Sequence, residues 1–274
     1  MSPQTFSNAA DAFLLTRGLL GHKEFQRAHE TVQLALARFP GHSGLEDIAF
    51  LLSPKWVGDT VCSRYRLRTT SEFDLPFFMA CFSDEEFMNK FHPITPRQRN
   101  ADVLKKSLTK LQYPAAQIRA VHRVIEADNI AARNIDHSYC KETPALHGLV
   151  SFVEIDATNR RAELLIGIPA QEDRGSGIGL TAGLLALDFA FNQIGLKKLT
   201  SAIIGSNEHS HRSTLALGFA IEGCRQQHVR IPQTMKWADS RDYGLVDENF
   251  RMNSRLARLS KRLLGRDITE LVIR

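Results

Sequence analysis

The first part of the chain shows the apolar spacing of helices. Two segments within residues 10–42 carry apolar residues three and four positions apart, with a break at Gly21–Lys23, and a third such segment covers residues 44–52. Residues 53–60 contain proline, glycine and polar residues, which is typical of a linker. The pattern therefore predicts an N-terminal all-α module of residues 1–58.

The pattern after residue 60 alternates between strand and helix periods. Long helical segments are expected at 83–91, 101–112 and 178–193, the last of them apolar on two adjacent stripes. Short apolar or alternating runs predict strands, at 64–70, 118–127, 146–156, 161–170, 199–204, 219–229 and 243–250. Helices interleaved with mostly consecutive strands indicate a mixed α/β (α+β) domain over residues 59–250.

The last segment, residues 251–274, predicts a basic amphipathic helix. Met252, Leu256, Leu259 and Leu263 follow helical spacing, and arginines and lysines lie off that stripe. Such a helix could bind nucleic acid, lipid headgroups or an acidic partner. Alternatively, its leucines dock on the body of the protein and leave a solvated basic face, which we favour because no aromatic residues accompany the charges.

Composition changes this picture little. The net charge is +5, and 43% hydrophobic with 24% charged residues is usual for a globular protein. No apolar run is long enough to span a membrane, and the N-terminus lacks the features of a secretory signal. The four cysteines are widely spaced and contain no C-x-x-C pair, so we expect reduced thiols and a cytoplasmic location.

Three glycines, Gly175, Gly177 and Gly179, lie at the start of the most apolar predicted helix. Bare amides at a helix N-terminus form an anion site. A P-loop would need a lysine after the last glycine. A dinucleotide fingerprint should follow the first strand of a sheet, whereas three strands are expected before the strand that leads into this loop. The loop therefore favours a phosphate-bearing ligand of another kind, with a plain helix start as the alternative.

Arg174-x-x-Gly177-x-Gly179 resembles the pyrophosphate loop of the GNAT acetyltransferase superfamily. The context of the loop, between a strand and a long apolar helix that leads to another strand, strengthens that resemblance. "NEHSHRSTLALGF" is similar to a block of the branch that acetylates ribosomal-protein N-termini, with Asn207, Ser210, Gly218 and Phe219 as matching residues. The likeness covers residues 64–250. The N-terminal helices resemble one tetratricopeptide repeat without a second copy.

The resemblance implies a GNAT fold, a mixed but mostly antiparallel sheet of six to seven strands whose fourth and fifth strands splay apart. Acetyl-CoA would lie in the gap as the co-substrate, with no metal. The residues implied to bind it are Leu165, Ile166, Gly167 and Ile168 on the fourth strand, Arg174, Gly175, Ser176, Gly177, Ile178 and Gly179 in the loop, and Asn207. Instead of binding the cofactor, Gly167 could serve as the glycine of a β-bulge, and Asn207 could cap the following helix.

The same resemblance suggests two catalytic residues. An amine attacks the thioester after losing a proton to a base, for which we expect Glu163, with Glu154 and His209 as alternates. Ser210 stands near the position of the sulfur, unless it is only a helix N-cap. Many members have a tyrosine four residues later, where this chain has Thr214. His209 and His211 lack a third ligand at sensible spacing and are expected to be loop histidines.

The sequence thus predicts an acetyl-CoA-dependent N-acetyltransferase that acts on a protein N-terminus, an amino sugar or a small-molecule amine. An alternative function is a catalytically weak CoA-binding protein that recruits a partner through the N-terminal helices. A third is a nucleic-acid-associated module that uses the basic tail, which we do not favour as the main role. A protein partner or a second copy would bind through the N-terminal helices, and the identity of the acceptor stays open.

Overall fold

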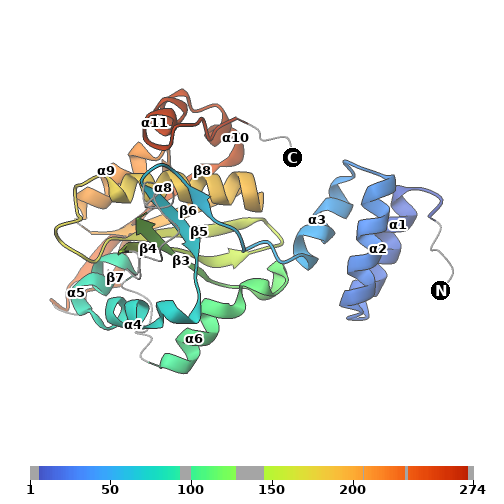
Figure 1. Cartoon of the computed structure of the whole chain (residues 1–274), viewed down its shortest axis with the longest axis horizontal. Coiled ribbons are helices and arrows are strands. Elements are labelled where there is room, and N and C mark those ends of the chain that lie inside the picture. Colours follow the sequence, from blue (N-terminus) through green and yellow to red (C-terminus); the bar gives the residue numbers. More distant parts are fainter. Residues whose placement is uncertain (1–5, 93–99, 128–144, 206, 232–233, 271–274) are drawn as a thin grey trace, which may run out of the picture.

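The computed structural model describes residues 6–92, 100–127, 145–205, 207–231 and 234–270. Its centre is an eight-stranded sheet in the order β1-β2-β3-β4-β5-β6-β8-β7 (Figure 1). The strands are β1 (Thr60–Val61), β2 (Tyr65–Thr69), β3 (Val121–Ala127), β4 (Leu146–Asp156), β5 (Arg161–Gly167), β6 (Lys198–Ile204), β7 (Ala220–Arg230) and β8 (Trp237–Val246). Neighbours pair antiparallel except β5 and β6, which are parallel. The mixed α/β expectation is confirmed, with β1 as one strand more than predicted.

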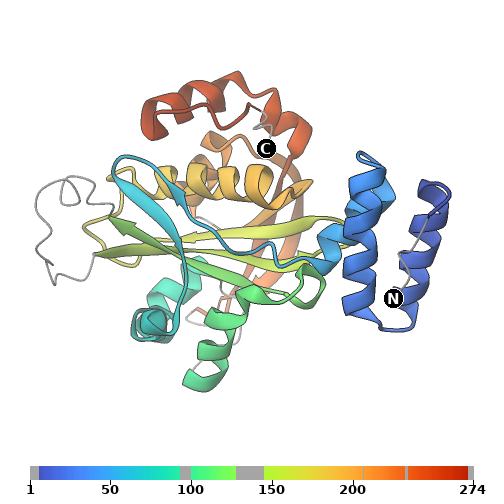
Figure 2. The same ribbon diagram turned by 45° about the vertical axis from the view of Figure 1, so that its right-hand side comes forward.

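Helices cover both faces of this sheet (Figure 2). One face carries α8 (Ile178–Leu187), which continues as a π-helical segment (Asp188–Ile194) and ends at Gly195 in the left-handed conformation. Eight of the ten α8 residues are buried, as expected for a helix that is apolar on most sides. The other face carries α4 (Leu75–Ser83), α5 (Glu85–Phe91) and α6 (Ala101–Thr109), whose side chains form a second cluster with Val124 and Leu149 of the sheet.

The connections include three short 3-10 turns and one further helix. The turns are Glu72–Asp74, Lys110–Gln112 and Ala115–Gln117, and the helix is α9 (Glu208–Ala216). No helix in the described part of the chain is long and apolar enough to cross a bilayer.

The N-terminal module consists of α1 (Ala9–Gly21), α2 (Phe25–Arg38) and α3 (Ser43–Leu52), which share a small core of their own. These three helices stand beside the sheet (Figure 1). The segment expected to be a linker is not free, because Trp56 is fully buried and packs on Phe152 and Phe189 of the main core. Arg123 of β3 donates hydrogen bonds to the carbonyls of Trp56 and Gly58. The module is therefore anchored to the sheet.

The C-terminal segment differs from the expected strand and long helix. The strand ends at Val246 and is followed by α10 (Asp247–Arg251). The amphipathic helix is α11 (Ser254–Leu264), which stops where Gly265 adopts a φ of 75°. Its Leu256 is fully buried against the main core, which confirms that the helix docks on the body. Met252 precedes the helix and is exposed, so it does not belong to the apolar stripe.

Candidate functional site

Strands β5 and β6 separate in the middle of the sheet. They pair only from Arg161 to Glu163 on β5 and from Lys198 to Thr200 on β6. β5 continues to Gly167 and β6 to Ile204 without pairing to each other. The edge of β5 beyond Glu163 that faces β6 therefore offers unpaired backbone N–H and C=O groups, to which an extended ligand can bind as a strand would. Leu165, Ile166 and Gly167 lie on this free edge, and Ile168 follows it.

The glycine loop connects the free edge of β5 to the N-terminus of α8. Gly175 and Gly177 have φ values of 83° and 92°, a region that disfavours any other residue, and Gly177 caps α8. A Cβ added at either position would meet no atom within 4 Å. No side chain of the described residues fills the space in front of these glycines, and the positive end of the α8 dipole points toward it. The loop is shaped to bind an anion such as a pyrophosphate.

Three side chains of the loop, those of Arg174, Asp173 and Ser176, hold it in place. Arg174 turns back, and its guanidinium donates to the carbonyls of Ile168 and Pro169, at 3.1 and 2.9 Å. The Asp173 carboxylate lies 2.8 Å from Nδ1 of His147, at the start of β4. Ser176 Oγ donates to the Asp173 carbonyl and accepts weakly from the Ile178 amide at 3.4 Å. These contacts fix the loop without using the amides of Gly175 and Gly177, which have no acceptor among the described residues.

Glu163 lies at the last paired position of β5, where the two strands begin to separate. Its side chain is buried, and its Oε1 accepts a hydrogen bond from the Ala202 amide of β6 at 3.1 Å. Burial raises the pKa of Glu163, and the nearby Glu154 carboxylate acts in the same direction. A buried carboxylate with a raised pKa at the edge of an opening has the properties of a general base.

Glu154 is placed by an irregularity in β4. The β4–β5 register shifts between Val153 and Asp156, and Glu154 within this bulge has a φ of 49°. A non-glycine residue in the left-handed region costs roughly 1–3 kcal/mol and is held there by its surroundings. The side chain is exposed, in contrast to that of Glu163. Of the two carboxylates, Glu163 therefore has the environment that suits a base.

Asn207 and Ser210 lie at the start of α9, near the end of β6. Asn207 is the N-cap of α9, because its side chain accepts from the Ser210 amide at 3.2 Å. The capping alternative is therefore confirmed for Asn207 and wrong for Ser210. Ser210 Oγ makes no hydrogen bond within the described residues. A contact of either side chain with a ligand stays a prediction.

The two histidines beside Ser210 are part of α9, so the expectation of loop histidines is wrong. His211 is buried, with Nδ1 at 2.7 Å from the Tyr243 hydroxyl and Nε2 at 3.2 Å from the Gly205 carbonyl. His209 is exposed on the helix surface. No group of three or more metal-ligating side chains that could hold an ion occurs in the described ranges.

Gly167 has a packing reason for its missing side chain. A Cβ at this position would lie 2.5 Å from Cζ of Phe87 on α5, and Phe91 would also be too close. Substitution at Gly167 would therefore force the Phe87 and Phe91 rings to move. The backbone edge at Gly167 nevertheless stays free, so packing against α5 and ligand binding are compatible.

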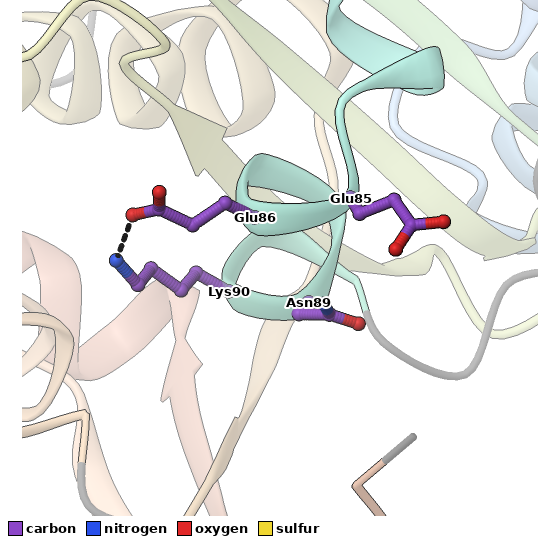
Figure 3. A pocket seen from close by; sticks show the side chains of 4 residues that line it. All are labelled: Glu85, Glu86, Asn89 and Lys90. Carbon is purple, nitrogen blue, oxygen red and sulfur yellow. Dashed lines mark hydrogen bonds and ion pairs between the residues drawn. The ribbon is translucent and has the colours of Figure 1, made fainter. Parts of the chain in front are cut away.

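Helix α5 also forms a shallow pocket on the surface, lined by Glu85, Glu86, Asn89 and Lys90 (Figure 3). Glu86 and Lys90 form an ion pair at 2.7 Å, and both side chains are mostly exposed. An exposed pair of this kind contributes little to stability.

A different pocket, which lies between α4–α6 and the sheet, was not predicted from the sequence. The phenylalanines within residues 73–91 indicate an apolar region in the sequence, but their spacing does not show that they surround a pocket.

Comparisons with known proteins agree with this geometry. The sequence profile of the acetyltransferase (GNAT) domain family matches residues 64–220. The spermidine N(1)-acetyltransferase of Escherichia coli (strain K12) is 40% identical over 76 residues, which is 28% of this chain and 40% of that enzyme. The uncharacterized N-acetyltransferase YoaA of Bacillus subtilis (strain 168) is 24% identical over 169 residues, which is 61% of this chain and 85% of YoaA.

Among solved structures, the spermidine N-acetyltransferase of Vibrio cholerae in complex with CoA and spermine has a similar fold. Its TM-score is 0.55 at 21% identity, with 68% of this chain and 98% of that chain covered. This likeness concerns the fold. The family match does not extend to the N-terminal helices and does not separate the ribosomal-protein branch from others. Both the branch and the tetratricopeptide-like repeat therefore stay predictions.

Proposed function

Because the chain belongs to the acetyltransferase (GNAT) domain family, we propose that it transfers an acetyl group from acetyl-CoA to a primary amine. The observation that carries this proposal is the pairing of β5 and β6, which stops at Glu163 and leaves a free backbone edge. That edge leads directly into the open glycine loop. A pantetheine arm and a pyrophosphate follow one another in CoA just as the edge and the loop follow one another here.

The residues of this region fit acetyl-CoA. The free edge of Leu165–Ile168 would pair with the amide groups of the pantetheine arm, and the amides of residues 174–179 would receive the pyrophosphate. Support comes from the empty space in front of Gly175 and Gly177, since any Cβ there would occupy the approach. The α8 N-terminus adds a favourable potential for negative charge.

In the proposed reaction, the amine nitrogen forms a bond to the acetyl carbon, and the carbon–sulfur bond of the thioester breaks. Glu163 takes the proton that the amine must lose, directly or through water. Its raised pKa keeps the carboxylate basic enough for this transfer. Ser210 Oγ, with no partner in the described structure, would donate a hydrogen bond to the departing thiolate as negative charge develops on sulfur.

The test is isothermal titration with acetyl-CoA, together with a thiol-release assay on a panel of amines. Gly177→Glu should abolish measurable binding, because its side chain and charge would enter the pyrophosphate position. Gly265→Glu is the matched control: Gly265 also has a positive φ and open space around it, but it ends α11, on a helix that does not form the site. Equal affinity in the two variants would refute the assignment.

A further inference from the structure

A cavity of about 220 Å³ lies between helices α4–α6 and the sheet. Its walls come from α4, α5 and α6 and from the adjacent strands β3, β4 and β5. The lining residues are Phe82, Met88, Phe91, His92, Leu104, Ser107, Ala120, His122, Ser151, Val153 and Leu165. Most of these side chains are apolar, and the set contains no carboxylate, lysine or arginine. The cavity is therefore suited to an uncharged, apolar group.

The few polar groups of the cavity are uncharged at neutral pH. Nδ1 of His122 lies 2.7 Å from Ser151 Oγ, and the ring packs against Phe78 and Phe82. Burial lowers the pKa of His122 to about 4, so the imidazole is neutral. Burial also lowers the pKa of His92, which opposes the effect of the nearby Glu154. Neither histidine supplies a counter-ion for a cation or an anion inside the cavity.

The cavity adjoins the proposed catalytic group. Leu165 in its wall lies two residues beyond Glu163 on β5, so both side chains project from the same face of the sheet. In the neighbouring strand, Val153 of the cavity wall is paired directly with Glu163. The exposed Glu154 acts electrostatically on both His92 and Glu163. Glu163 thus lies beside the cavity wall, whereas the described residues that line the cavity include no carboxylate, lysine or arginine.

From this arrangement we propose that the acceptor is a primary monoamine with an apolar body, of which an arylalkylamine is the simplest kind. The inference rests on the proposed transferase function. The amino group lies at Glu163, and the apolar body fills the cavity beneath α4–α6. A polyamine would place a second ammonium in a space whose described lining offers no counter-ion, which is costly for any buried charge. The acceptor class therefore differs from that in the names of the spermidine acetyltransferases.

The first test measures kcat/KM by thiol release with phenethylamine, ethylamine and spermidine. Phenethylamine should exceed ethylamine by at least about tenfold, because each apolar group that fills a pocket contributes roughly a tenfold or greater preference. It should also exceed spermidine. If ethylamine or spermidine is the better acceptor, the cavity does not select the acceptor, while the transferase proposal stands. If no amine releases thiol although acetyl-CoA binds, the proposed function fails and this inference fails with it.

The second test changes the cavity from the α6 side. Ser107 lines the cavity and is half-buried, so Ser107→Phe fills the space and Ser107→Asp adds a carboxylate without removing a core side chain. Each should lower kcat/KM for phenethylamine at least about tenfold, and Ser107→Asp should lower the preference over spermidine. Lys106→Phe, one residue earlier on the exposed surface of α6, is the control and should match the parent. Equal phenethylamine kinetics in all four proteins, with unchanged thermal melting, would overturn the proposal.

Discussion

Replacing Glu163 by glutamine separates a catalytic role from a structural one. The amide oxygen of Glu163→Gln can still accept the hydrogen bond from Ala202, which is 3.1 Å away in the parent. The structural loss is therefore below about 1 kcal/mol, the net value of an ordinary hydrogen bond. The amide cannot take a proton, so kcat/KM should fall about 100-fold or more, the usual contribution of a general base. That fall corresponds to about 3 kcal/mol in the barrier.

Stability should move in the opposite direction from activity. Burial raises the pKa of Glu163 above its ordinary value, so the folded state binds this proton more tightly than the unfolded state does. Its contribution to stability is present at low pH and is lost as pH rises through the raised pKa. At pH 8 the parent carries the cost of a buried carboxylate, which the glutamine removes. The melting temperature of Glu163→Gln should therefore equal or exceed that of the parent at pH 8.

The assay compares thiol release by parent and variant from pH 5 to pH 9 with one amine. The ratio of their kcat/KM values cancels the ionisation of the amine. The ratio should fall toward one as pH drops below the Glu163 pKa, because a protonated glutamate resembles glutamine. Glu154→Gln is the control, since this exposed carboxylate is screened by solvent, and its kcat/KM should stay within about threefold of the parent. A pH-independent ratio near one for Glu163→Gln, or a large loss in Glu154→Gln, would refute Glu163 as the base.

Three further predictions concern the anchor, the loop and the start of α9. Trp56→Ala should lower the free energy of unfolding by about 3–5 kcal/mol in chemical denaturation, since this side chain is fully buried. Trp237→Ala is the control: this side chain is 60% exposed, and its loss should change the free energy of unfolding by less than about 0.5 kcal/mol. Equal effects of the two substitutions would contradict the anchoring of the N-terminal module. His147→Ala should weaken acetyl-CoA binding in titration calorimetry by no more than about fivefold, because the His147–Asp173 pair is partly exposed, and a total loss would show that the pair does more than hold the loop. Ser210→Ala should lower kcat by about tenfold or more without lowering the melting temperature, and unchanged kcat would remove Ser210 from the mechanism.

The parts of the site that depend on the backbone could be predicted from the sequence. Gly175 and Gly177 adopt positive φ values that other residues avoid, so their presence before an apolar helix already indicated an open turn at a helix N-terminus. The strand before the loop and the helix after it follow from their apolar periods. Gly195 ends the helix as expected. These features are local in the chain, and each is specified by residues within about one turn or strand of it.

The parts that depend on distant side chains could not be predicted. The bond from Ala202 to Glu163 joins residues 39 positions apart, and the burial of Trp56 depends on Phe152 and Phe189. The proline and glycine of residues 53–60 are typical of a linker, and the sequence does not show whether Trp56 within this segment is buried. His211 shows the same limit, since its partner Tyr243 belongs to a strand whose register cannot be read from periodicity.

Within the candidate site, the features that could be predicted from the sequence are those proposed to bind the cofactor, and the cavity, which could not be predicted, is proposed to bind the acceptor. The cofactor is common to the family, and in the proposed complex it would be held by backbone groups, for which the sequence needs only glycines and a strand edge. The acceptor is particular to each protein, and in this chain it would be held by side chains from three helices and three strands that meet around one cavity. Gly167 would contribute to both the cofactor site and the acceptor site. Its backbone lies on the free edge of β5 proposed for the cofactor, and Phe87 of α5 occupies the place where a side chain would be. A larger residue at position 167 would therefore displace the Phe87 and Phe91 rings of α5. Because Phe91 lines the cavity, such a substitution should impair acceptor selection.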